Sequence, residues 1–160
     1  MSVAFTKEDS AETASETHLP ERPVPEGPNL VTADGIAALE RQLAEARAAY
    51  DTALTIEDVN ERRRQAANPF RDLRYFAERL RTAQVMAAPE HHDVVAFGST
   101  ATFERDDGRV QTYRIVGEDE AEPRSGTISF ASPMARALLG KSVGEVALVN
   151  GSEVEVVAIG

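Results

Sequence analysis

The chain of 160 residues contains no cysteine and no tryptophan, and only 6% of its residues are aromatic. Without cysteine there is no disulfide, no thiolate zinc site and no thiol nucleophile, which fits a reducing compartment. The sequence also lacks an apolar run of the roughly 18 residues that span a bilayer, and its N-terminus lacks the basic-then-apolar pattern of a signal peptide. We therefore expect a cytoplasmic protein without a membrane partner.

Basic residues are also scarce. Seventeen Lys and Arg residues face 27 Asp and Glu residues, which gives a formal net charge of -10 and a pI of about 4.8. A protein of this charge does not coat free nucleic acid, because the phosphates would repel it. Any contact with DNA or RNA should therefore be local or pass through a protein partner. The apolar content of 42% allows a modest core in one or two domains.

Residues 1–28 are poor in core-forming side chains. They carry six acidic and two basic residues, together with Pro20, Pro23, Pro25 and Pro28. This composition predicts a disordered acidic tail that ends in a stiff, proline-rich linker.

Two apolar seams with helical spacing occur within residues 29–86. Their residues follow alternating steps of three and four: Ile36, Leu39, Leu43, Ala46, Tyr50 and Ala53, then Phe70, Leu73, Ala77 and Leu80. Thr32 is a suitable N-cap for the first helix. Because the seams are short and close together, they predict an antiparallel coiled-coil hairpin rather than a self-associating coiled coil. We therefore expect a monomer.

Two signals compete for the turn of this hairpin. Residues 55–58 match a capping box, with Thr55 as the N-cap and Asp58 as the third helical residue, and they lie near the midpoint of residues 32–85. Alternatively, Asn68 would cap a helix that Pro69 opens. We favour the first position, which leaves Pro69 as a kink inside the returning helix.

Residues 87–94 read as a linker, and residues 95–160 show the pattern of a small α+β domain. Strands are expected at 99–105, 110–116, 126–130, 145–149 and 153–159. Asn150-Gly151 joins the last two as a tight hairpin. Ser132 would cap a short helix with Pro133 at its first position and Gly140 after its end. The prediction is a twisted antiparallel sheet with one short helix packed on it.

Two stretches of this domain resemble the Gre transcription elongation factors: residues 111–121 (QTYRIVGEDEA) and residues 132–141 (SPMARALLGK). The resemblance implies an FKBP-like fold for residues 95–160. It also implies docking at the rim of the secondary channel of RNA polymerase, through a surface that includes Ser132, Pro133 and Arg136. In that family the hairpin enters the channel, and two acids at its tip help to hold Mg²⁺ and a water, so that a backtracked polymerase cleaves its own transcript. The factor itself is not an enzyme, and we expect no cofactor of its own.

The acids Asp58 and Glu61 lie at the predicted tip with a spacing of three residues, which places both carboxylates on one helical face. Carboxylate oxygens are natural ligands of Mg²⁺, and two-metal phosphodiester hydrolysis needs a held metal and an oriented water. By the resemblance, Asp58 and Glu61 would share the Mg²⁺ of the polymerase active site, with Glu57 as a third acid. Acids in a first helical turn also stabilise the helix by themselves.

Arg62, Arg63 and Arg64 follow these acids directly. They would contact RNA phosphates or an acidic channel wall, or pair with the acids across helical turns. Residues 58–64 (DVNERRR) depart from the usual tip of the family, which reads acid-Leu-x-Glu-Asn-x-Glu-Tyr. Each arm is also shorter than the family norm by roughly two turns, about 10 Å. Two functions of different class follow: a transcript cleavage factor, or a channel-binding regulator that inhibits or modulates polymerase without promoting cleavage.

Other charged groups could suggest a metal site. His91 and His92 stand between Glu90 and Asp93, and residues 118–120 are three consecutive acids. Adjacent histidines on a loop rarely converge on one ion, and no distant ligand pattern accompanies them. We interpret the first group as linker residues and the second as a charged turn.

Overall fold

The computed structural model of the chain describes residues 19–160, so most of the predicted tail lies outside the described residues. The described chain forms two compact units. The hairpin unit contains residues 19–27 and Leu39–Thr82, and the sheet unit contains Pro28–Ala38 and Ala83–Gly160. No helix within residues 19–160 combines the length and the apolar content that a bilayer crossing requires.

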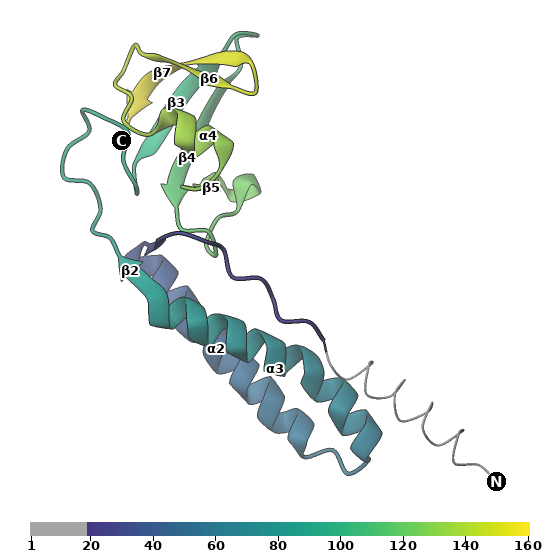
Figure 1. Ribbon diagram of the computed structural model, residues 1–160. Coiled ribbons are helices and arrows are strands. Elements are labelled where there is room, and N and C mark those ends of the chain that lie inside the picture. The colour runs from purple at the N-terminus through teal and green to yellow at the C-terminus, as the bar shows by residue number, and fades with distance from the viewer. Residues whose placement is uncertain (1–18) are drawn as a thin grey trace. The chain divides into compact units, whose positions relative to one another are not determined.

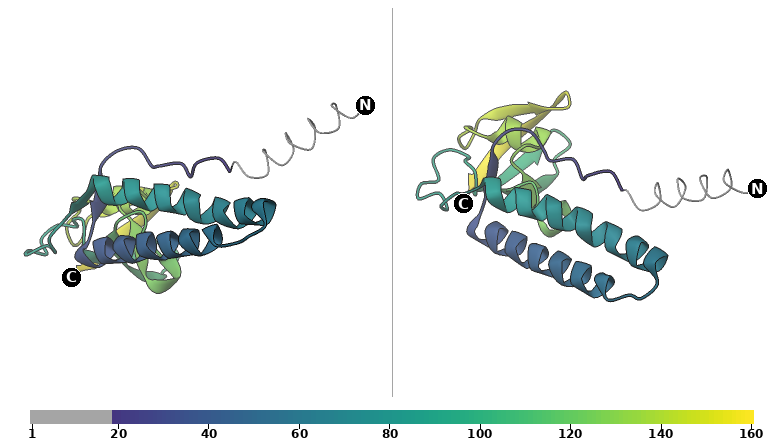
Figure 2. Two further views of the ribbon diagram at one scale, coloured as in Figure 1. Left: turned by 90° about the horizontal axis from the view of Figure 1, so that it is seen from below. Right: turned by 60° about the horizontal axis from the view of Figure 1, so that its bottom comes forward.

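The hairpin unit is built on two long helices that run side by side (Figures 1 and 2). They are α2 (Ala33–Leu54) and α3 (Val59–Thr82). Leu39, Ala46 and Ala53 of the predicted first seam are buried. On α3 the buried face is instead made of Tyr75, Phe76 and Arg79. The predicted second seam is thus only partly right, and Phe70 stays 44% exposed although its ring lies 5.5 Å from that of Tyr50.

The turn lies where the sequence predicts it, between Leu54 and Val59. Its capping differs from the prediction. The hydroxyl of Thr55 donates to the carbonyl of Thr52 at 2.6 Å and so closes α2. Asp58 opens α3 as its N-cap, because its Oδ1 accepts from the backbone N–H of Glu61 at 2.8 Å. Pro69 lies inside α3, so the alternative turn at that residue is wrong.

Residues 19–27, which we call the N-terminal strap, run along α3 (Figures 1 and 2). The guanidinium of Arg22 lies 3.9 Å from the ring centroid of Tyr75, and its Nη1 lies 3.1 Å from Oδ1 of Asp72. Arg74 and Glu21 form a second ion pair at 2.5 Å. The disorder predicted for residues 1–28 therefore does not hold for this segment, which contacts α3. Composition overlooks it because one arginine stacked on aromatic rings supplies packing that a count of apolar residues omits.

The sheet unit contains a five-stranded sheet in the order β5-β4-β3-β7-β6. Its strands are β3 (Thr100–Arg105), β4 (Val110–Val116), β5 (Thr127–Ser129), β6 (Val146–Val149) and β7 (Ser152–Ile159). All neighbours pair antiparallel except β4 and β5, which are parallel. The sheet is therefore mixed, and the prediction of a purely antiparallel sheet is wrong at β5. The chain passes through the 3-10 helix η1 (Pro123–Ser125) between the two strands, which lets β5 run in the direction of β4.

The core of the sheet unit lies between the sheet and the short helix α4 (Pro133–Leu138). Phe103, Ile115, Val156 and Leu138 are fully buried there. The predicted cap of α4 is confirmed, since the Ser132 side chain accepts from the N–H of Ala135 at 3.2 Å. The expected fold class, a helical hairpin followed by a sheet domain with one short helix, is also confirmed.

A second, two-stranded sheet belongs to the same unit. Its strands β1 (Asn29–Val31) and β2 (Ala83–Val85) run parallel, and they directly precede α2 and follow α3. The sequence pattern assigns residues 29–86 to the hairpin alone and predicts no such pair. The pairing joins segments more than fifty residues apart, so no local pattern indicates it.

Candidate functional site at the end of the hairpin

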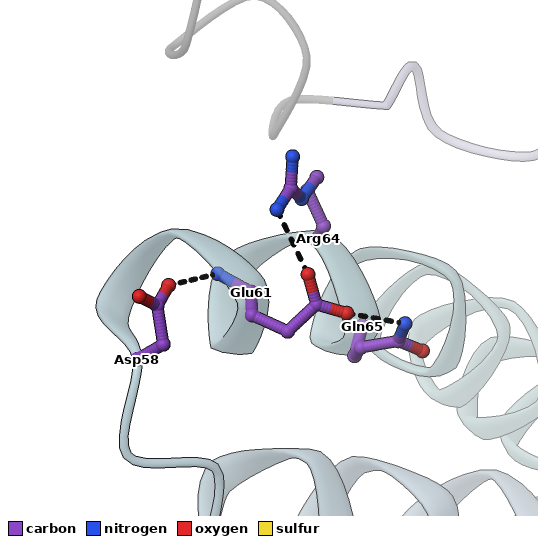
Figure 3. A network of polar contacts seen from close by, with 4 residues as sticks. All are labelled: Asp58, Glu61, Arg64 and Gln65. Atoms are coloured by element: carbon purple, nitrogen blue, oxygen red, sulfur yellow. Dashed lines mark hydrogen bonds and ion pairs between the residues drawn. The ribbon is translucent and has the colours of Figure 1, made fainter.

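The acids predicted to act at the tip are Glu57, Asp58 and Glu61, and we refer to them as the tip acids. They lie in the loop between the helices and in the first turn of α3. Figure 3 shows Asp58 facing the backbone N–H of Glu61, while the Glu61 side chain turns along the helix. The side chains of Glu57 and Asp58 are exposed to solvent and that of Glu61 is partly exposed. The structure thus brings all three predicted acids to one end of the hairpin.

Both oxygens of Glu61 already have partners. Oε1 accepts from Nε2 of Gln65 and Oε2 accepts from Nη2 of Arg64, each at 2.8 Å (Figure 3). These contacts lower the pKa of Glu61 from its ordinary value, first through the hydrogen bond from Gln65 and then through that from Arg64 and its charge. Glu61 is therefore ionised at neutral pH. Because the contacts are exposed, solvent weakens them.

The basic run behind the acids divides into different roles. Nη1 of Arg62 donates to the carbonyl of Ile56 at 3.2 Å and so braces the loop, whereas Arg64 pairs with Glu61. Arg64 thus makes the pairing with an acid that was predicted as the alternative role, whereas Arg62 bonds to the backbone instead of to an acid. The side chain of Arg63 is exposed.

A metal ion held by this protein alone would need several converging ligands. Among residues 19–160, no group of three or more His, Cys, Asp or Glu residues is arranged to hold one. His91 and His92, and likewise residues 118–120, form no such group. The tip acids could therefore contribute only part of a coordination shell, and water or another molecule would have to supply the remaining ligands.

The predicted docking residues lie at the start of α4 in the sheet unit. Ala135 and Leu138 of this helix face the core, while Pro133 and Arg136 are exposed. A spacing of three residues places these two side chains on the same face. Ser132 is partly exposed, and its hydroxyl is engaged as the N-cap. The helix thus presents one small surface outward that the core does not use.

Comparisons with known proteins identify the family. Residues 90–160 match the model of the C-terminal domain of the transcription elongation factors GreA and GreB. The chain is 35% identical over 149 residues to the transcription elongation factor GreA of Methylobacterium nodulans, and the match covers 81% of this chain and 94% of that protein. The chain belongs to the GreA/GreB family.

Other members of the family match over different lengths. GreB of Pseudomonas putida is 33% identical over 137 residues, covering 76% of this Gre-family chain and 85% of that protein. GreA of Maricaulis maris is 45% identical over 75 residues, which span 48% of its length. Among solved structures, the GreA factor homolog 1 (Gfh1) of Thermus thermophilus aligns with a TM-score of 0.39 at 25% identity, over 84% of this chain and 99% of that one.

The capping role of Asp58 in this Gre-family chain was not predicted from the sequence. A signal for it was present, because Asp58 followed three residues later by Glu61 fits a capping box as well as Thr55 does. The same two residues that the family resemblance marks as functional therefore also begin α3. The role of Arg22 carried no such signal, because its ring partner Tyr75 lies more than fifty residues away.

Proposed function

We propose that this protein binds RNA polymerase as an accessory factor and acts at its secondary channel, without being an enzyme itself. Relatives named transcription elongation factors match over as much as 94% of their length, which supports this proposal. The sheet unit would dock at the channel rim through Ser132, Pro133 and Arg136. The hairpin would enter the channel as part of a monomeric factor and would touch nascent RNA only indirectly.

The tip acids would then stimulate transcript cleavage in backtracked complexes. The observation that carries this step is the gathering of three solvent-accessible carboxylates at the end of the hairpin, within five residues of each other. Such carboxylates suit Mg²⁺ but cannot complete its shell alone. At the polymerase active site they would share a metal that the polymerase holds, and help to orient the attacking water.

A second candidate is a channel-binding regulator that does not promote cleavage. The observation that favours it is the engagement of Glu61 by Arg64 and Gln65, together with the use of Asp58 as a helix cap. The two helices of the hairpin, α2 with 22 residues and α3 with 24, are about 33 and 36 Å long, and this length limits how far the tip would reach into the channel. In this case the hairpin would occupy the channel while its acids stabilise only the hairpin itself.

Transcript cleavage by a deliberately backtracked polymerase tests the proposal. The variant Asp58→Asn with Glu61→Gln is suited to the test, because asparagine caps helices about as well as aspartate while both charges are lost. Exposed acids on α2 supply a matched control, Glu40→Ala with Glu45→Ala. Stimulation by the wild type and the control, but not by the tip variant, is the expected result. A polymerase-bound wild type that stimulates no cleavage would instead support the regulator.

A further inference from the structure

The first turn of α2 is held by a carboxylate from a distant part of the chain. Glu120, in the turn that follows β4, accepts hydrogen bonds from the backbone N–H of Thr32 at 2.9 Å and from the Thr32 hydroxyl at 2.5 Å. The N–H of Gly117 approaches the same carboxylate at 3.2 Å. All of these residues belong to the sheet unit. Glu120 is one of the three consecutive acids that the sequence analysis interprets only as a charged turn.

This carboxylate does more than cap a helix, because α2 already has a cap. The Thr32 hydroxyl accepts from the N–H of Gly35 at 3.0 Å, and the backbone carbonyl of Thr32 accepts from the N–H of Ile36 at 3.0 Å. These are the bonds of an N-cap residue. Glu120 therefore binds the cap residue itself, across 88 positions of sequence. Thr32 is only 4% exposed, so the bonds form where water competes little.

Two glycines make room for this contact. A Cβ atom on Gly35 would lie 2.1 Å from Oε2 of Glu120, and one on Gly117 would lie 2.6 Å from the carbonyl oxygen of Leu30. Glycine is a weak helix former, and Gly35 stands in the first turn of α2. The close approach of the Glu120 carboxylate gives a physical reason for a glycine at this position.

The base of the hairpin is closed next to this contact. β1 leads into Thr32 and pairs with β2 in parallel register, and the N–H of Met86 donates to the carbonyl of Val31 at 2.9 Å. The residues just before α2 and just after α3 are thus tied to each other within the sheet unit. Fixing the first turn of α2 therefore fixes the root of both helices.

We propose that Glu120 is a positioning residue that holds the root of the hairpin, which is the first turn of α2, in place within the sheet unit. This rests on the proposed function in one respect: a hairpin that must reach a fixed point in a partner needs a defined root. Glu120 touches no reacting group and acts through Thr32. Its loss should leave docking by α4 intact while the first turn of α2 samples a wider range of positions.

A measurement without polymerase tests the positioning directly. Because the chain has no cysteine, Ala37→Cys on α2 and Glu153→Cys on β7, both exposed and both in the sheet unit, allow two spin labels whose distance distribution reports the position of the first turn of α2. We expect a narrow distribution in the otherwise unchanged protein and loss of the narrow peak in Glu120→Ala. Glu120→Gln keeps the shape of the side chain but removes its charge, and it should give an intermediate width. Glu122→Ala, in the same loop, is the control and should stay narrow.

Gly35→Ala separates positioning from helix stability. Alanine favours a helix more than glycine does, yet its methyl group would push the carboxylate of Glu120 away. Positioning by Glu120 predicts a broad distribution in this variant in spite of a more stable α2. A narrow distribution in both Gly35→Ala and Glu120→Ala would overturn the proposal. Circular dichroism of the same samples shows whether each variant is folded. If Glu120→Ala is unfolded, the width of the distribution in Glu120→Gln tests the proposal instead.

The polymerase assay extends the test to function. At equal occupancy of polymerase, Glu120→Ala should lower the hairpin-dependent effect by about tenfold or more, because small misplacements of acting groups reduce rates steeply. Its affinity for polymerase should match that of the wild type. An unchanged effect per bound factor would contradict the proposal. If the wild type has no hairpin-dependent effect, the proposed function fails, while the spin-label distances still decide the role of Glu120.

Discussion

The two units of this Gre-family protein are stabilised in different ways. The sheet unit has a continuous apolar core, in which Phe103, Ile115 and Val156 are all 0% exposed. The hairpin unit buries fewer apolar side chains among its described residues, namely Leu39, Ala46, Ala53, Tyr75 and Phe76, and it is reinforced by polar contacts such as those of Arg22. Elements with few buried apolar contacts open at low free-energy cost. In the proposed function, docking would fall to the firmer sheet unit and action to the hairpin unit, which opens more easily.

The largest expected effect comes from the core of the sheet unit. Phe103→Ala should lower the free energy of unfolding by about 3–5 kcal/mol, because it removes a fully buried ring and leaves a cavity. Urea denaturation followed by circular dichroism measures this loss. The matched change on the hairpin, Phe70→Ala, should cost clearly less because Phe70 is partly exposed. An equal loss of unfolding free energy in the two variants would contradict this difference between the two units.

The next effect concerns the strap on α3. Arg22→Ala should destabilise the hairpin unit by about 1 kcal/mol, through loss of the contact with the Tyr75 ring and of a half-exposed ion pair. Amide hydrogen exchange along α3 should become faster, while exchange in the β3–β4 pair should not change. The exposed Arg41 on α2 provides the control, Arg41→Ala. Unchanged exchange in α3 would mean that the strap adds nothing to the hairpin.

A smaller and more local effect is expected at the turn. Asp58→Ala removes the N-cap of α3 and should cost about 1 kcal/mol, whereas Asp58→Asn should cost much less. Glu57→Ala is the control, because no cap bond depends on that residue's side chain. Faster amide exchange at residues 59–62 in Asp58→Ala, but not in Asp58→Asn or Glu57→Ala, would support the role of Asp58 as the N-cap of α3. Similar exchange in all three variants would refute it.

The smallest expected effect is a change in the pKa of Glu61. Hydrogen bonds from Gln65 and Arg64 hold its pKa below the ordinary value of 4.5. A carboxyl group with a lowered folded pKa stabilises the fold above its unfolded pKa, and this contribution is lost as the pH falls through the folded pKa. Carboxyl NMR titration should find the lowered pKa in the wild type and a higher value in Arg64→Ala. The same pKa in both proteins would show that Arg64 does not hold Glu61 in solution.

The sequence predicted those elements that depend on local signals. Ser132 and Pro133 start α4 as expected, and Asn150-Gly151 joins β6 to β7, with both residues at positive φ. Capping chemistry and turn conformations act within a few residues, so a pattern can reveal them. For the candidate site, the sequence indicated which acids lie at the tip. Between the two available caps, Thr55 and Asp58, it did not indicate the one that opens α3.

The features that escaped prediction depend on contacts between distant segments. The parallel pairing of β5 with β4, the pair β1–β2, the stacking of Arg22 on Tyr75 and the bonds from Thr32 to Glu120 are of this kind. None of them has a local sequence pattern, because the partner residues can be recognised only after the chain has folded. The root of the hairpin is therefore visible only in three dimensions, although its end could be read from the sequence.

The most direct test of this division of roles measures polymerase affinity and transcript cleavage side by side. One variant changes the exposed face of α4, Pro133→Asp with Arg136→Glu, and the other changes the hairpin end, Asp58→Asn with Glu61→Gln. We expect the first to lose affinity by about tenfold or more, equivalent to about 1.4 kcal/mol, yet to stimulate cleavage at saturating concentration. The second should bind as the wild type does and stimulate no cleavage. If each variant loses affinity and cleavage together, docking and action are not divided between the two units.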